Sequence, residues 1–382
     1  MPRIARSSYG FLTGRMLRSA LALAVMATAL SLVEVVPASA AVTPAWGYVL
    51  SNHPFDQQST PIRAWQKNSR GFANKVTRLS TGVYIVHFNG LEGLGVNGGT
   101  VYATVGQSFV EQCKVGSWTQ TATSVDVTVR CFDRNGSPQD AQFEAAYIDP
   151  GSNPPSHLGY VWANKPTAQS YTPAANYQFN ARDPGVAVNK VVRHGVGNYS
   201  VKMPFIGASH STVKVTAYGD DSTECQSNGW GGSGQVTANV LCHDAFGTPV
   251  DAMFTLAYTV KSSMLGVTGR KYGYAWANNP TAGVTYTPNP AFQWDSETNA
   301  PDITVTRLGT GVYRVTMQGL GPPGGSLQPG GNIQVTGWGP TVAQCNTDLA
   351  EAFPPSELDV FVYCVDTAAN PIDAFFVVQY MK

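Results

Sequence analysis

A segment of about 110 residues, the size of a small domain, occurs three times in this chain of 382 residues. The second and third copies open with Gly-Tyr-x-Trp-Ala-Asn-x-Pro-Thr at Gly159 and Gly273, whereas the first opens at Gly47 and has Leu50 and Ser51 in place of Trp and Ala. Each copy continues with Arg-x-x-x-Gly-x-Tyr and closes on Cys-x-Asp. We therefore predict three tandem domains, over residues 46–148, 158–260 and 272–382.

Apolar and polar residues alternate along many segments, as in 124–131 and 140–147 of the first copy. This period of two predicts strands with one apolar face, and the polar residues between (Asp140, Gln142 and Glu144 in the second segment) predict that the other face is wet. No segment has a helical period, and turn signals recur about every ten residues. We expect an all-β chain of three sandwiches of antiparallel sheets, with immunoglobulin-like and jelly-roll-like strand orders both open.

Six cysteines fall two per repeat, which in an exported chain predicts one internal disulfide per domain. The predicted pairs are Cys113–Cys131, Cys225–Cys242 and Cys345–Cys364. Closing a loop of this length contributes roughly 3 kcal/mol in the chain-entropy model. Cys131 continues the apolar face of 124–131, so its disulfide is expected inside. No Cys-x-x-Cys pair is present, and we predict neither a metal site nor a cofactor.

The first forty residues resemble a signal peptide. Four arginines precede an apolar run over 21–33, and Ala38-Ser39-Ala40 fits a small-residue cleavage site. The run is short for a membrane span, so we expect a secreted protein. The chain has 24 basic and 24 acidic residues, and removal of 1–40 takes away four Arg and one Glu, which leaves a net charge of −3. No basic stripe is visible in the sequence, and we expect no nucleic-acid partner.

The Gly-Tyr-x-Trp-Ala-Asn-x-Pro-Thr opening, together with the Cys-x-Asp close, resembles repeats of exported bacterial proteins of unassigned function, chiefly actinobacterial ones. The resemblance covers all three copies and is weakest in the first, at Leu50 and Ser51. It implies secretion and a β-domain, and it carries no active site to this chain.

Several polar residues recur in every copy. We interpret the Arg of each Arg-x-x-x-Gly-x-Tyr motif as lying over the Tyr ring across a hairpin, a cation–π contact. The paired acidic residues around the closing turn suggest calcium, but two carboxylates fall short of the six to eight oxygens that the ion needs, so Asp-stabilised turns are the preferred interpretation. These residues are Arg78, Arg193 and Arg307, with Asp133, Asp140, Asp244, Asp251, Asp366 and Asp373.

Aromatic residues indicate a ligand-binding site more clearly than the recurring Arg and Asp residues do. Trp118 and Trp230 each follow a cysteine by five residues among polar neighbours, and the third copy has Ala350 at that position. A Trp present in two copies and absent from the third suggests ligand binding, with a Trp lid over the disulfide as the alternative. We interpret Trp162 and Trp276 as buried, because the first copy has Leu50 there.

Signals of catalysis are weak. The chain has no Gly-x-Ser-x-Gly elbow and no His-Glu-x-x-His motif, and its six His residues are scattered. We therefore expect a non-catalytic protein that binds an extracellular or cell-surface ligand, with glycan as one candidate. Two alternatives are a structural or spacer protein of the cell exterior, and a secreted hydrolase whose site in the third copy uses Asp348, Glu351 and Glu357.

Overall fold

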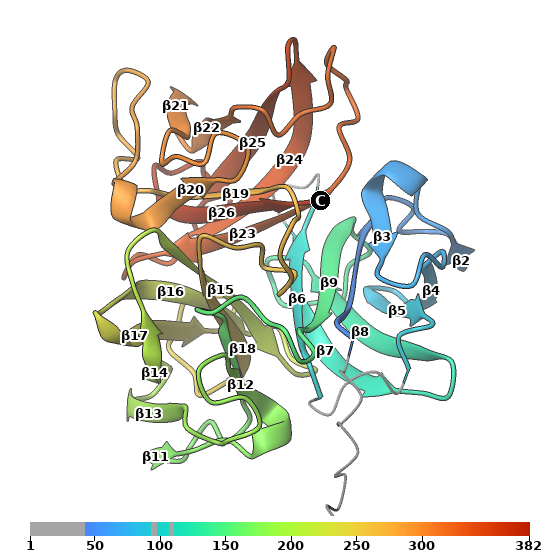
Figure 1. Ribbon diagram of the computed structural model, residues 1–382, viewed down its shortest axis with the longest axis vertical. Helices are drawn as coiled ribbons and strands as arrows, with labels where there is room; N and C mark the ends of the chain where they lie inside the picture. Colours follow the sequence, from blue (N-terminus) through green and yellow to red (C-terminus); the bar gives the residue numbers. More distant parts are fainter. Residues whose placement is uncertain (1–42, 93–97, 107–110) are drawn as a thin grey trace, which may run out of the picture. The chain divides into compact units, whose positions relative to one another are not determined.

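The computed structural model describes residues 43–92, 98–106 and 111–382 (Figure 1). They form strands β1–β26 and three short 3-10 helices, so the predicted all-β class is confirmed. The predicted signal peptide lies outside the described residues. Among the residues that are described, no helix has both the length and the apolar character needed to cross a membrane.

The first repeat builds two antiparallel sheets whose inner faces share one hydrophobic cluster. The first sheet has the order β3 (Gln66–Asn68), β1 (Ala45–Ser51), β9 (Phe143–Asp149) and β6 (Thr100–Val105). The second has the order β2 (Gln58–Ser59), β4 (Lys75–Ser80), β5 (Val83–Asn89), β8 (Ser124–Phe132) and β7 (Gln112–Gln120). Helix η1 (Arg63–Trp65) connects β2 to β3.

The second repeat has the same strand order. Its first sheet is β12 (Gln178–Asn180), β10 (Gly159–Ala163), β18 (Met253–Val260) and β15 (Ser211–Tyr218). Its second sheet is β11 (Ser170–Tyr171), β13 (Lys190–Gly195), β14 (Asn198–Gly207), β17 (Gly234–His243) and β16 (Glu224–Gly231), and η2 (Ala175–Tyr177) precedes β12.

The third repeat follows the same plan. Its first sheet is β20 (Gln293–Asp295), β19 (Tyr272–Ala277), β26 (Phe375–Met381) and β23 (Asn332–Trp338). Its second sheet is β21 (Thr304–Gly309), β22 (Val312–Met317), β25 (Glu357–Val365) and β24 (Gln344–Phe353), and η3 (Pro290–Phe292) precedes β20. The sandwich architecture expected from the alternating pattern is thus present in each repeat.

The three predicted disulfides are present, each between two adjacent antiparallel strands. Cys113 pairs with Cys131 across β7 and β8, and the equivalent bonds join β16 to β17 and β24 to β25. Cys131 is fully buried, as its place on the apolar face predicted. Disulfides of this kind are typical of proteins that fold in an oxidising compartment.

The repeats also pair with one another, edge to edge, so that sheets of neighbouring repeats join into two nine-stranded sheets. Strand β7 of the first repeat runs parallel to β15 of the second, at Val115 and Tyr218, and β16 runs parallel to β23 of the third. A parallel bridge between Thr347 in β24 and Gly106, which directly follows β6, joins the third repeat to the first. We call these contacts seam 1–2, seam 2–3 and seam 3–1. Equivalent positions meet at each seam, so the three contacts form a closed cycle.

Where the repeats meet, three equivalent threonines bind the backbone of a neighbouring repeat. The hydroxyl of Thr104 donates to Val335 O (3.3 Å), that of Thr216 to Ala103 O (3.4 Å), and that of Thr336 to Val215 O (3.4 Å). These threonines lie on the polar sides of β6, β15 and β23, and all three side chains are buried. The polar faces of these strands thus pack against protein.

The prediction of a wet outer face is wrong for the closing strand of the first repeat. All seven residues of β9 are buried, and Glu144 is only 2% exposed. Its carboxylate accepts a hydrogen bond from Ile333 N of the third repeat (2.5 Å). Lys214 of the second repeat is equally buried, and its ammonium donates to Val335 O (2.7 Å). These two hydrogen bonds link the first and the second repeat to the third.

Several residues at the junctions between repeats are buried as well. Leu158, Met264 and Leu265 belong to a hydrophobic cluster that also holds Tyr102 of the first repeat and Met381 of the third. Residues 43–382, in their described part, belong to one compact unit. Independent folding of the three predicted ranges therefore stays a prediction.

Candidate functional site

The recurring Arg–Tyr motif is an ion-paired hairpin, and the predicted cation–π contact is wrong. In the second repeat, Arg193 Nε and Nη2 each lie 2.8 Å from a carboxylate oxygen of Asp251. The same carboxylate accepts hydrogen bonds from Gly197 N (3.1 Å) and the Tyr199 hydroxyl (3.0 Å). Gly197 has a φ of +64°, and a Cβ there would collide with the carbonyl of Cys242. The motif therefore fixes the end of each sandwich.

The same arrangement occurs in the other two repeats, as Arg78–Asp140 and Arg307–Asp373. The three acidic residues of the Cys-x-Asp sequences behave alike: the Asp244 carboxylate accepts from Phe246 N and Thr248 N, which stabilises the turn. Among the described residues, no group of three or more His, Cys, Asp and Glu side chains is placed to hold a metal ion. These recurrent residues support the fold in every copy.

Trp118 lies at seam 1–2, where its ring meets aromatic residues of the second repeat. Its indole NH donates to Gly98 O (2.6 Å), and its ring centroid lies 5.2 Å from that of Trp162 and 5.6 Å from that of Tyr218. Tyr177 of η2 stands against Trp162, with centroids 4.5 Å apart. All four rings are half-buried and line a groove of about 230 Å³, which we call the aromatic groove. Its other lining residues are Gly98, Thr119 and Gln120.

Trp230 occupies the equivalent position at seam 2–3 but is more enclosed. It is 8% exposed, and its indole NH donates to Ser211 Oγ (3.1 Å). Its ring contacts Phe292 and Trp276, whose centroids lie 5.2 Å and 6.2 Å away. Trp276 in turn packs on Trp338 at 4.6 Å. The structure thus places each predicted tryptophan at a different seam, and it does not bring the two together.

Seam 3–1 has no tryptophan at either position. Ala350 takes the place of Trp118 and Trp230, and Leu50 takes the place of Trp162 and Trp276; both belong to the buried cluster of the third repeat. Trp65 of η1 lies in that cluster too. Leu50 and Ala350, the two positions where a repeat lacks the tryptophan of the other copies, therefore both lie at seam 3–1. In the sequence, the joint loss of both tryptophans from one pair of positions was the signal that these side chains contact a neighbouring repeat.

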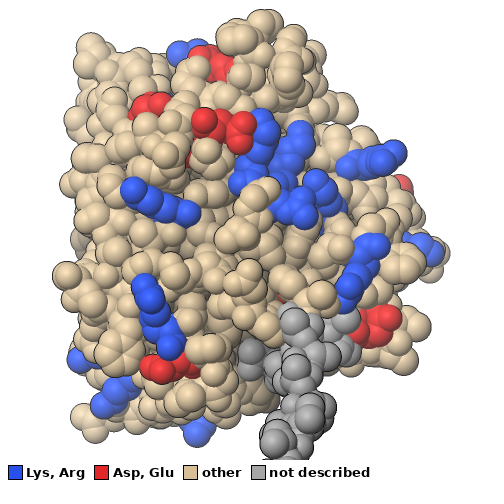
Figure 2. All heavy atoms as spheres, viewed as in Figure 1, with Lys and Arg blue, Asp and Glu red and all other residues tan. Residues whose placement is uncertain are grey.

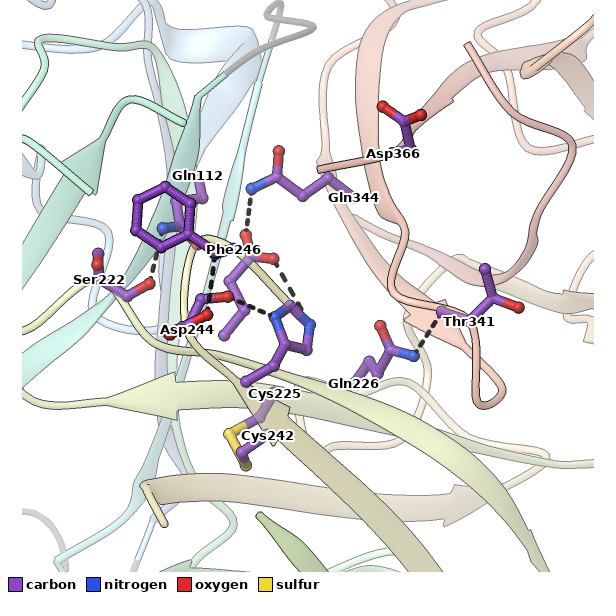
Figure 3. A network of polar contacts seen from close by, with 12 residues as sticks. Gln112, Ser222, Cys225, Gln226, Cys242, Asp244, Phe246, Thr341, Gln344 and Asp366 are labelled. Carbon is purple, nitrogen blue, oxygen red and sulfur yellow. Dashed lines mark hydrogen bonds and ion pairs between the residues drawn. A yellow bond between two sulfur atoms is a disulfide. The ribbon is translucent and has the colours of Figure 1, made fainter. Parts of the chain in front are cut away.

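A small polar cavity lies between the three repeats, and Figure 3 shows part of the network around it. Gln112 Nε2 donates to Ser222 O (2.8 Å), Gln226 Nε2 donates to Thr341 O (2.9 Å), and Gln344 Nε2 donates to Glu224 Oε1 (2.7 Å). Each bond crosses from one repeat to another. The cavity measures about 70 Å³, which admits a few waters of ~30 Å³ each but no sugar unit.

Titratable groups line this cavity. Burial raises the pKa of Glu224, which has His243 at 4.0 Å and Gln344 as opposing influences. Burial lowers the pKa of Lys114, whose ammonium donates to Asp221 (2.7 Å) and Thr223 (2.8 Å). Such groups can exchange protons with water, but the cavity is too small for a polymer substrate. Their visible role is to join the repeats.

The acidic residues considered for hydrolysis lie on the hairpin of β24 and β25. Asp348 and Glu351 are in β24, and Glu357, which begins β25, accepts a hydrogen bond from Gln318 (2.7 Å). None of the three lines the aromatic groove or the central cavity. The hydrolase alternative stays a prediction.

Comparisons with family models, with curated proteins and with solved structures found no match for this chain.

Proposed function

We propose that this protein is secreted, is not an enzyme, and binds an extracellular glycan in the aromatic groove at seam 1–2. The observation that supports the proposal is the convergence of Trp118, Trp162, Tyr177 and Tyr218, all half-buried, on one open groove. Aromatic rings give broad contact area at low entropic cost, and their polar tips remain able to hydrogen-bond.

The rim of the groove supplies polar groups beside these rings. Thr119 and Gln120 are exposed at the end of β7, next to Trp118. Ligand sites combine apolar walls with a few polar groups that fix orientation, and the groove has both. Its volume of about 230 Å³ lies below the ~300–1,000 Å³ of enclosed ligand pockets, which favours contact with one unit of a chain over capture of a whole molecule.

The test uses the full exported chain, because the seams require all three repeats. Binding to a panel of insoluble neutral polysaccharides is measured by depletion from solution and by tryptophan fluorescence. Tyr177→Ala is expected to weaken binding about fivefold to tenfold, the equivalent of ~1–1.5 kcal/mol of lost ring contact. Phe292→Ala, the equivalent change at seam 2–3, is the matched control and should leave binding unchanged. Equal loss in both variants, or no binding to any polysaccharide, contradicts the proposal.

A second candidate is a structural protein of the cell exterior, favoured by the closed cycle of seams, which fixes the three repeats against one another. In that case the purified protein self-associates at micromolar concentration, and Tyr177→Ala leaves that association intact. Analytical ultracentrifugation of the parent protein and of the Tyr177→Ala variant distinguishes a structural protein from a glycan-binding one.

A further inference from the structure

A second groove, which we call the basic groove, lies where the end of β26 meets η1 and β3 of the first repeat. It measures about 710 Å³, within the range of ligand-binding pockets. Three cationic residues line it, Arg63, Lys67 and Lys382, and no Asp or Glu does. A group of Lys and Arg side chains is visible on this face of the molecule in Figure 2, where the chain ends in Figure 1.

The lining cations of this groove have no acidic partner among the described residues, although Lys382 Nζ donates a hydrogen bond to Pro329 O (2.6 Å). Arg270, which does not line the groove but lies over the Trp46 ring (4.4 Å to the centroid), is a further cation near Lys67. No ion pair joins Arg63, Lys67 or Arg270 to an acidic side chain in the described part of the chain. Lys67 has its pKa lowered by burial and then by the nearby charge of Arg270. Lys382 has its pKa lowered by burial and then by Lys67 and Lys271. Cations that crowd one another in this way are stabilised by an anion placed between them.

The fold itself does not require this charge, as the equivalent groove in the second repeat shows. That groove measures about 700 Å³ and is lined by η2, the middle of β12, residues 184–185 and the connection after β9. Ala175 stands there in place of Arg63, and Phe179 in place of Lys67. No charged side chain lines it. The same groove geometry thus occurs with and without cations, so the cations serve a purpose other than folding.

We propose that the basic groove binds an acidic polysaccharide, one whose sugar units carry carboxylate groups. A guanidinium matches a carboxylate through two parallel hydrogen bonds, and an ammonium adds a mobile point charge. Phe72, which is 58% exposed and also lines the groove, offers an apolar face to a sugar ring. The site is separate from the aromatic groove, since the two share no lining residue, and it does not depend on the function proposed above.

The test measures binding of the full chain to polygalacturonate by biolayer interferometry. The NaCl concentration is varied from about 50 to about 300 mM, a range around the roughly 0.1 M at which the Debye length is about 10 Å. Neutral dextran is the uncharged comparison. The double variant Arg63→Ala, Lys67→Gln introduces at position 63 the residue that the second repeat carries, so the fold is expected to tolerate it. We expect at least tenfold weaker binding and a weaker salt dependence. Lys190→Gln, at an exposed lysine of β13, is the control and should bind as the parent does.

Other outcomes overturn the proposal. Binding to polygalacturonate that survives in the double variant, or binding to neutral dextran that the double variant weakens to the same extent, shows that the cations do not hold an acidic polymer. Tighter binding to single-stranded DNA than to polygalacturonate assigns the groove to a nucleic acid instead. Tyr177→Ala separates this site from the aromatic groove, because it should leave binding to polygalacturonate unchanged while it weakens binding to neutral glycans.

Discussion

Leu50 and Ala350, three hundred positions apart in the sequence, lie in the same buried cluster at seam 3–1. At the other two seams both positions hold tryptophan, as Trp162 with Trp118 and Trp276 with Trp230. Two large rings are thus replaced together by two smaller side chains. This concerted change indicates that the pair is matched for volume, as close packing requires.

A single large residue at this seam is therefore expected to be harmful. Ala350→Trp places an indole at a position that is 1% exposed, and we expect a loss of about 1–3 kcal/mol in the free energy of unfolding from overpacking. Urea titration measures the loss. The complementary change, Trp230→Ala, leaves a cavity and should cost about 3–5 kcal/mol.

Combining Ala350→Trp with Leu50→Ala tests directly whether the two positions are matched for volume. If the two positions are coupled, the double variant loses less stability than the two single variants lose together. Strict additivity would show that Leu50 and Ala350 pack independently.

Acid is expected to weaken the hairpin motif of each repeat. The hydrogen bonds from Arg193, and then those from Gly197 and Tyr199, hold the pKa of Asp251 below its ordinary value of 3.8, although burial opposes them. A depressed carboxyl pKa stabilises the folded state above the unfolded pKa, and that contribution is lost as pH falls through the folded pKa. Asp251→Asn should therefore lower the urea midpoint at pH 6 and should show a smaller further loss between pH 4 and pH 2.

Asp183→Asn, outside the motif, is the control for that experiment and should follow the parent protein at every pH. A parent-like acid profile in Asp251→Asn would show that the Arg193–Asp251 pair adds nothing to stability.

Raising the pH above 7 is expected to increase the stability of the folded state through Lys214. Burial lowers the pKa of this ammonium to about 7, and the charge of Glu144 opposes that shift. In the unfolded chain the lysine keeps its proton to about pH 10.5, so between the two values the unfolded state binds more protons and the stability of the folded state rises with pH. Relative to Lys214→Met, the parent protein should gain up to about 1.4 kcal/mol per pH unit above pH 7.

The measurement is a pair of urea titrations, on parent and variant, at pH 7, 8 and 9. Below pH 10 the tyrosines remain protonated in the unfolded chain and do not disturb the comparison. A stability difference that is constant over this range would contradict a lowered pKa for Lys214.

Removing one disulfide should destabilise the whole unit. Cys225 and Cys242 close a separation of 17 residues, so the double change to Ala is expected to cost roughly 3 kcal/mol. Urea unfolding under oxidising conditions measures this. Because the seams tie the repeats together, we expect a single cooperative transition at a lower midpoint. Early unfolding of the second repeat alone would argue against coupling through the seams.

The alternating pattern was sufficient to predict the sandwiches and the disulfides, because both are local properties of neighbouring strands. Residues 124–131 lie in β8 (Ser124–Phe132) with the predicted inner face, and Cys131 lies on it. The Asp-stabilised turn at Asp244 was also predictable, since its partners lie within four residues.

The seams could not be predicted in the same way. A strand with one polar face gives the same sequence pattern whether that face meets water or another repeat, and for this reason the pattern predicts a wet face for Glu144. Lys214, a charged residue on such a face, is 2% exposed. The basic groove was equally hidden, because Lys67 and Lys382 are distant in sequence and approach each other only through seam 3–1.

The basic groove occurs at one place in a cycle of three equivalent sandwiches. An assembly of three identical subunits would display each groove three times and could crosslink polymer strands. Fusion of the copies into a single polypeptide lets one junction diverge while the others keep their packing, and the equivalent groove of the second repeat indeed has no charged lining residue. The expected stoichiometry is one acidic chain segment per protein, with no tendency to form networks.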